Sequence, residues 1–96
     1  MFPGGDGAFA RFLARQIRYP EYGRNNAIQG NVILSFEVEK DGTLSNFQVV
    51  HSVSKGLDRE ALRVIKMSPK WTPSTLYGVP QKVRHTVSIR FALNTM

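Results

Sequence analysis

Residues 57–73, LDREALRVIKMSPKWTP, decide the fold of this chain. At about 100° per residue, the apolar side chains share one side of a helix and the basic side chains lie opposite, which predicts one buried face. The apolar set is Leu57, Ala61, Val64 and Ile65. Gly56 precedes the helix, and Pro69 prevents its continuation. Trp71, the only tryptophan, follows on a stiff corner, where we expect it to close the core and to donate its indole N–H to a carbonyl.

The residues near the N-terminus predict two helical segments. Asp6 is placed to cap a helix, because apolar residues recur after it at helical spacing. We expect this helix to end at Arg18, since Pro20 disfavours helical geometry at the residue before it. Pro20 can then begin a short helical segment that ends near residues 25 and 26.

A change of period at Gly30 predicts two antiparallel strands. The first alternates polar residues with an apolar set that faces the core, which is Val32, Leu34, Phe36 and Val38. Asp41-Gly42 predicts a hairpin turn whose two central residues have positive φ. The second strand does not keep one parity, which indicates a bulge or a late start near Asn46, with Phe47 and Val49 directed inward.

The last third of the chain predicts a loop and a third strand. We expect Leu76 and Tyr77, in the loop, to lie back on the core. Residues 82–93 alternate cleanly between apolar and polar side chains. The order helix, strand, strand, helix, strand predicts a two-layer α+β fold. The third strand can pair antiparallel with the first or parallel with the second. We favour the first arrangement, a three-stranded antiparallel sheet of order two, one, three, in which the third strand is an edge.

Composition narrows the class of protein. The chain has 96 residues, of which 42% are hydrophobic, enough for one domain with one core. No apolar run approaches the roughly 20 residues that cross a bilayer, and no signal-peptide pattern opens the chain. There is no cysteine, which leaves the compartment open. The net charge of +6 arises entirely within residues 55–96, so nucleic acid, an anionic surface or an acidic partner remains possible.

Motifs for catalysis are not found, so we expect no enzyme, no cofactor and no metal site. The sequence has no phosphate-binding glycine loop and no zinc-protease or serine-hydrolase motif. His51 and His85 have no carboxylate at a spacing that would complete a metal site. A nucleic-acid module is the less favoured alternative, because Arg84 and Arg90 share a strand face that carries no aromatic residue for base stacking.

Several short motifs, in order, resemble those of one known family. They are Tyr19-Pro20, Ile28-x-Gly30-x-Val32, Phe36-x-Val38, Asp41-Gly42, Val49-Val50-x-Ser52, Leu57-Asp58-x-x-Ala61, Trp71-x-Pro73, Gly78-x-Pro80 and Val87-x-Ile89-x-Phe91. Their order and spacing resemble the C-terminal domain of TonB proteins. The lead-in from Gly4 to Leu13 is similar to variants found in the Bacteroidetes group. The resemblance implies one domain over residues 1–96, with a helical lead-in at 1–18 and a core at 19–93.

That resemblance implies an energy-transducing adaptor rather than an enzyme. In the family this domain lies in the periplasm, at the end of an inner-membrane-anchored protein with a proline-rich spacer. Its partners are outer-membrane TonB-dependent transporters, whose TonB box adds as a strand to the domain, while ExbB and ExbD engage the anchor end and use the proton gradient to drive import. A TonB-like accessory domain of a membrane sensor or protease is the alternative within the family.

The same resemblance implies which residues contact partners. Gln16 matches the position that contacts the box region, and residues 83–92 match the receiving strand, which the chain could also use to form a homodimer. Gly23 and Ser74 depart from the usual residues of the family without affecting this expectation. The expected partner-binding set is Gln16, Val83, Arg84, His85, Thr86, Val87, Ser88, Ile89, Arg90, Phe91 and Ala92.

Overall fold

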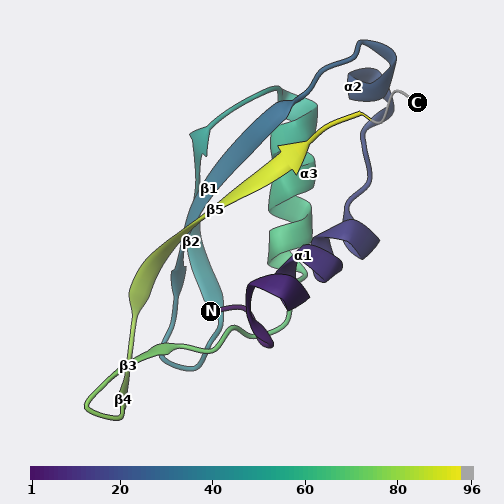
Figure 1. Ribbon diagram of the computed structural model, residues 1–96. Helices are drawn as coiled ribbons and strands as arrows, with labels where there is room; N and C mark the ends of the chain where they lie inside the picture. Colours follow the sequence, from purple (N-terminus) through teal and green to yellow (C-terminus); the bar gives the residue numbers. More distant parts are fainter. Residues whose placement is uncertain (94–96) are drawn as a thin grey trace.

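The computed structural model describes residues 1–93, apart from the side chain of Tyr22, and has helices packed on one side of a sheet (Figure 1). The chain is elongated, with principal extents of 49 × 23 × 16 Å. Its elements in order are α1 (Gly5–Gln16), α2 (Glu21–Asn25), β1 (Gly30–Val38), β2 (Leu44–His51), α3 (Lys55–Lys66), β3 (Ser74–Leu76), β4 (Val79–Gln81) and β5 (Val83–Phe91).

The main sheet has the order β2-β1-β5, and both pairings are antiparallel. Strand β5 pairs with β1 along its whole length, from Gly30 opposite Phe91 to Val38 opposite Val83. This confirms the predicted α+β class and the sheet order two, one, three, and excludes the parallel alternative. Strands β2 and β5 are therefore the two edges.

One core joins the sheet to α3. The alternating residues predicted for the first strand are all at most 1% exposed, and so are the four apolar residues of α3. Burying such a side chain contributes about 1.5–3 kcal/mol, so these two rows hold the layers together. Both predicted sets are confirmed: Val32, Leu34, Phe36 and Val38 from β1, with Leu57, Ala61, Val64 and Ile65 from α3.

Helix α3 begins at Lys55, two residues before the predicted start, because Ser54 caps it. The Ser54 hydroxyl accepts a hydrogen bond from the backbone N–H of Leu57 at 3.2 Å. Asp58 then reaches back to accept from the N–H of Val53 at 3.1 Å. These bonds satisfy donors at the helix start and fix the approach of the chain from β2.

Helix α1 also differs from its predicted limits. It begins at Gly5 after Gly4, whose φ of 86° ends the preceding turn, and Asp6 lies in the first turn without capping the helix. It ends at Gln16 rather than at Arg18. Arg63 of α3 donates to the carbonyl of Gln16 at 3.0 Å. The helix end is thus tied to α3 by a tertiary bond that the local sequence does not predict.

The turn between β1 and β2 is a three-residue loop, not the predicted two-residue one. Glu39 pairs with Thr43, and Gly42 donates its N–H to the carbonyl of Glu39 at 2.8 Å. Of the predicted pair, only Gly42 has positive φ, at 91°. A Cβ at Gly42 would lie 2.3 Å from the carbonyl oxygen of Trp71. Glycine is therefore required here by both conformation and space.

Strand β2 has the irregularity predicted near Asn46. That residue has a φ of 51°, and the register with β1 shifts between Ser35 and Glu37. Phe47 is half-buried against the core, as predicted. Val49 is opposite buried Leu34 and is therefore directed inward as predicted, but it remains 36% exposed. An outer strand has a neighbour on one side only, which leaves part of its inner face uncovered.

The segment after Trp71 forms a small hairpin, β3–β4, where the sequence indicated a loop. Tyr77 and Gly78 form its two-residue turn, with φ of 51° and 79°. Tyr77 is 97% exposed and Leu76 57%, so the expectation that they lie back on the core was wrong. The hairpin projects from the end of the molecule, at the lower left of Figure 1.

Candidate functional site

The outer edge of β5 is the candidate site. Strand β5 has β1 on one side and no strand on the other within residues 1–93. None of the backbone hydrogen bonds in this part of the chain joins that outer side to another segment. Since alternate residues of an antiparallel strand direct N–H and C=O groups away from the paired neighbour, the edge presents a row of available donors and acceptors.

The side chains of β5 divide between the two faces of the sheet. Val87, Ile89 and Phe91 are buried in the core, whereas the residues between them are exposed. Val83 and His85 continue the inner set as half-buried side chains. The predicted alternation is confirmed. Nine of the expected partner-binding residues form β5, and Ala92 directly follows the end of the strand.

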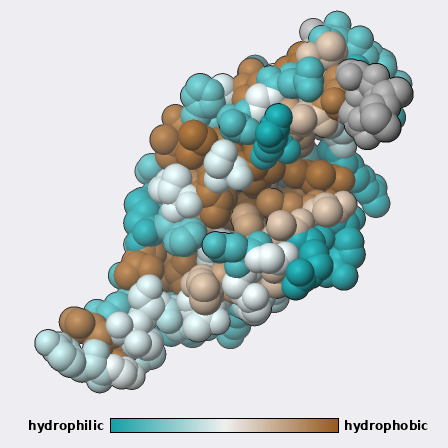
Figure 2. Space-filling view, viewed as in Figure 1, coloured by the Kyte–Doolittle hydropathy of each residue, from teal (hydrophilic) through white to brown (hydrophobic). Residues whose placement is uncertain are grey.

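A groove of about 210 Å³ runs along the middle of this edge. One wall is the stretch of β5 from His85 to Ser88, and the other is formed by the N-terminal segment and the start of α1. Hydrophobic surface is visible between β5 and α1 in Figure 2. The lining residues outside β5 are Met1, Phe2, Asp6, Phe9 and Trp71.

Aromatic contacts fix the shape of this groove. The rings of Phe2 and Phe9 meet the Trp71 ring edge-on at 5.7 and 5.6 Å between centroids. The ring of His85 lies 5.1 Å from the Trp71 ring. Partial burial lowers the pKa of His85 below its ordinary value, and the nearby ammonium of Met1 acts in the same direction. The neutral imidazole therefore forms part of an apolar wall at neutral pH.

Trp71 closes the core as predicted and is 3% exposed. Its indole N–H donates to the hydroxyl oxygen of Ser68 at 3.1 Å rather than to a carbonyl. The backbone N–H of Trp71 donates to the carbonyl of Gly42 at 2.9 Å, which joins the corner after α3 to the turn between β1 and β2. Trp71 therefore supports the groove wall from within the core.

The opposite face of the sheet is polar. Arg84 donates to the carbonyl oxygen of Asn46 at 3.1 and 3.2 Å, across the intervening β1. Glu37 lies between these strands and has a pKa below its ordinary value because Asn46 and Lys82 bond to its carboxylate. Arg90 is exposed near the far end of the strand. The exposed face of β5 thus presents a cation at each end.

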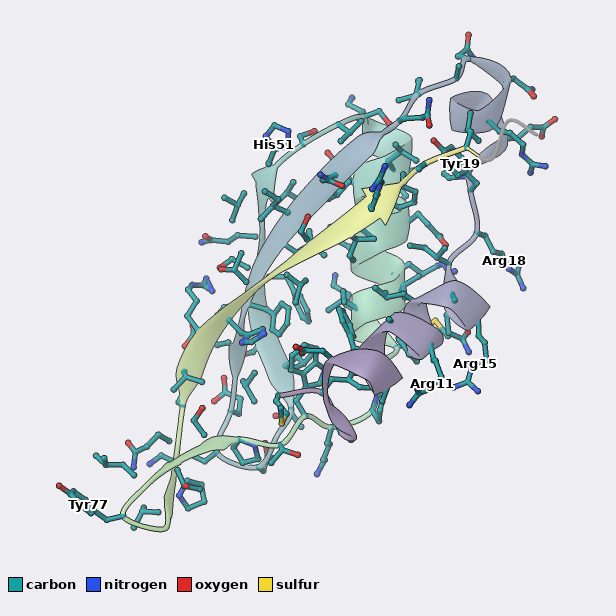
Figure 3. All side chains as sticks on the ribbon, in the orientation of Figure 1. Arg11, Arg15, Arg18, Tyr19, His51 and Tyr77 are labelled. Atoms are coloured by element: carbon teal, nitrogen blue, oxygen red, sulfur yellow. The ribbon has the colours of Figure 1, made fainter. Side chains whose placement is uncertain are left out.

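Gln16 is not placed at this edge by any contact that the structure describes. It is half-buried at the end of α1, and its carbonyl is bonded to Arg63 of α3. Arg11 and Arg15, on the same helix, point away from the sheet (Figure 3). Ala92, the last residue of the expected set, does not line the groove beside β5 but a separate cavity of about 530 Å³, together with Gln29. The role expected for Gln16 remains a prediction.

The sequence did not indicate the second wall of the groove. Phe2 is 7% exposed although it precedes the first helix, and its ring lies 5.3 Å from those of Phe9 and Phe12. The available signal was Phe2 close to the glycine pair at residues 4 and 5, followed by Phe9 and Phe12 at helical spacing. Its packing partner, Trp71, lies about seventy residues away and could not be identified from local pattern.

Residues 1–93 contain no cluster of three or more histidine, aspartate or glutamate side chains arranged to hold a metal ion. None of the helices in the same range has the length and apolar character needed to cross a bilayer.

Sequence comparison supplies the family. The chain matches the family described as Gram-negative bacterial TonB protein C-terminal over residues 15–93. It belongs to that family. TonB C-terminal domains are periplasmic parts of non-catalytic transport adaptors in Gram-negative bacteria. No curated protein matches the chain in sequence closely enough to count as a relative.

Solved structures agree on the fold. The solution structure of the Helicobacter pylori TonB C-terminal domain, residues 194–285, is 23% identical and superposes with a TM-score of 0.71 over 93% of this chain and 94% of that one. A longer form of the same domain, residues 179–285, is also 23% identical, with a TM-score of 0.67 over 91% of this chain and 78% of that one. Both therefore share the arrangement of helices and strands described above.

Proposed function

We propose that this domain binds the TonB box of outer-membrane TonB-dependent transporters by adding it as a strand to the outer edge of β5. It does so as the periplasmic C-terminal domain of an inner-membrane-anchored protein. ExbB and ExbD act on the anchor end of that protein, and the domain passes work from the proton gradient to the transporter during substrate import. Membership of the TonB family supports this transport role.

The unpaired edge of β5 is the observation that carries the proposal. Strand addition needs a straight strand with free backbone groups on one side, and Val83–Phe91 provides nine residues paired only with β1. The strand itself is firmly held, because its inner side chains enter the core. A peptide can therefore dock without unfolding the sheet, and the order becomes β2-β1-β5-peptide.

The expected affinity is modest. Each new backbone bond replaces a bond to water and contributes about 0.5–1.5 kcal/mol net, while association costs at least several kcal/mol in lost freedom of motion. Four to six such bonds contribute about 2–9 kcal/mol, and the association cost offsets much of this, so backbone pairing alone gives about millimolar affinity or weaker and side-chain contacts supply the rest. Such an affinity suits an adaptor that must release its partner after each transport cycle.

Amide hydrogen exchange with and without a transporter N-terminal peptide tests the proposal. We expect new protection in residues 83–92. Proline substitution at Thr86 and at Val87 distinguishes the outer edge of β5 from the side paired with β1, because N–H groups of adjacent strand residues point to opposite sides. One of the two variants should lose peptide binding while it keeps its melting temperature, and the other should lose stability by breaking the ladder to β1.

Protection that appears on α3, with residues 83–92 unchanged, would reject β5 as the receiving strand. So would two proline variants that both keep the peptide affinity of the unmodified domain. In the exchange experiment the amides of β2 serve as the internal reference for the other sheet edge.

A further inference from the structure

The two walls of the groove beside β5 come from different parts of the chain. Residues 15–93 are the part that matches the TonB family, whereas the wall opposite β5 is built by residues 1–9. Phe2 and Phe9 form the apolar part of that wall, and Trp71 lies behind them. A strand added to β5 would therefore lie against a surface contributed by residues outside the family match.

The geometry of a strand decides which side chains meet this surface. Successive side chains of an added strand point to opposite faces of the sheet, in step with those of β5. On the inner side they meet His85 and Val87 of β5 together with Phe2 and Phe9. This space is about 210 Å³ in volume, enough for one or two bulky side chains, and the rings of Phe2, Phe9 and Trp71 in its lining favour apolar ones.

The outer side has the opposite character. There an added strand extends the polar face on which Arg84 and Arg90 are exposed, with Thr86 and Ser88 between them. The Arg84 guanidinium is turned across β1 toward β2, where it bonds to the Asn46 carbonyl, so Arg90 is the arginine of this face that is left to meet an added strand. Exposed cations on the face of a neighbouring strand favour acidic side chains directly opposite or diagonal to them.

We propose that the preferred partner segment is an amphipathic strand, with bulky apolar side chains directed into the groove and acidic side chains directed to the arginine face. The inference rests on strand addition at β5 as proposed above, and it adds the sequence pattern of the segment that binds. Selectivity then arises from the wall built by residues 1–9, because backbone pairing alone does not distinguish sequences.

Three synthetic eight-residue peptides test the pattern. The first alternates leucine with aspartate, the second has the same composition in two blocks, and the third alternates leucine with lysine. Titration of each into the isotopically labelled domain, followed by amide shifts, gives the affinities. We expect the first peptide to bind about tenfold or more tightly than the second, because burial of one further leucine contributes that much. The third should also bind more weakly than the first, since lysine meets the like charge of Arg90.

Two variants at Asp6 distinguish the effect of filling the groove from the effect of removing the negative charge at its rim. Asp6 is exposed at the rim of the groove, so Asp6→Phe fills the space without altering the core. Asp6→Asn removes the same charge and leaves the groove open. We expect Asp6→Phe to weaken the alternating leucine and aspartate peptide about tenfold, and Asp6→Asn to keep or slightly improve its affinity.

The outcomes distinguish this inference from the proposed function. If all three peptides protect residues 83–92 with equal affinity, strand addition holds and the amphipathic pattern is wrong. If Asp6→Phe binds the first peptide as well as Asp6→Asn does, the groove does not receive its side chains and the inference is likewise overturned. If no peptide alters residues 83–92, while a transporter N-terminal segment also fails, both the inference and strand addition at β5 are rejected.

Discussion

Trp71 shows how one residue can connect parts of the chain that are distant in sequence. Its ring contacts aromatic rings from the N-terminal segment, from β1 and from β5. The sequence suggested a core position because a lone tryptophan followed a helix stop. The partners of the ring could not be predicted, since they depend on how three separate segments meet.

Replacement of Trp71 by alanine should destabilise the domain by about 3–5 kcal/mol, because a large cavity opens between the N-terminal segment and the sheet. Thermal unfolding followed by circular dichroism measures this loss. Tyr77→Ala is the matched control, since Tyr77 is 97% exposed and its removal should change stability by no more than about 0.5 kcal/mol. An unchanged melting temperature for Trp71→Ala, together with lost peptide binding, would assign this ring to the partner site instead.

At the scale of elements, hydrophobic periodicity and the positions of glycine and proline predicted the two layers but not the ends of the helices. The strands β1 and β5 and the buried face of α3 follow the alternation and helical spacing of their own residues. The ends of both longer helices differ, because Ser54 and Arg63 satisfy terminal groups through their side chains. The hairpin β3–β4 was missed since its strands have three residues each, too few to establish a period.

The position of the β5 edge, the proposed binding site, could be predicted from the sequence, whereas the groove could not. Sheet order followed from the length and chirality of connections, which placed β5 at an edge. The groove needs the N-terminal aromatics to pack against Trp71, a contact with no local signature. The role expected for Gln16 depended on the family resemblance alone, and its half-buried position beside α3 gives it no independent support.

The cap of α3 offers a test at this scale. Ser54→Ala removes the acceptor for the N–H of Leu57 and should cost about 1 kcal/mol of unfolding free energy. Ser54→Asp keeps an acceptor at the same place and should retain most of that stability. Urea unfolding of the two variants measures the difference. An unchanged stability for Ser54→Ala would mean that the helix start is held by Asp58 and not by the cap.

At the scale of the whole molecule, charge and shape point in the same direction. The net charge of +6 arises in the half of the chain that contains α3 and β5, and the exposed face of β5 carries two arginines. A long sheet edge with cations along it favours capture of acidic segments by long-range attraction before backbone pairing begins.

Charge reversal at both Arg84 and Arg90 should therefore slow association with an acidic transporter segment, with a smaller effect on dissociation. Added salt should reduce the association rate of the unmodified domain, because the Debye length is only about 8 Å at physiological ionic strength. Stopped-flow kinetics at several salt concentrations tests both statements. An association rate indifferent to salt would leave these arginines as hydrated surface groups, with Arg84 serving only its bond to Asn46.

The single tryptophan has a further consequence for optical work on this domain. Its indole is 3% exposed, bonded to Ser68, and packed against rings from Phe2, Phe36 and His85. Intrinsic fluorescence excited at the indole band therefore arises from one site that touches both walls of the groove. Detachment of residues 1–9 from the sheet would expose that site to water and shift its emission to longer wavelength, even while the three strands and α3 remain folded. The unlabelled chain thus carries its own reporter of whether the groove is assembled.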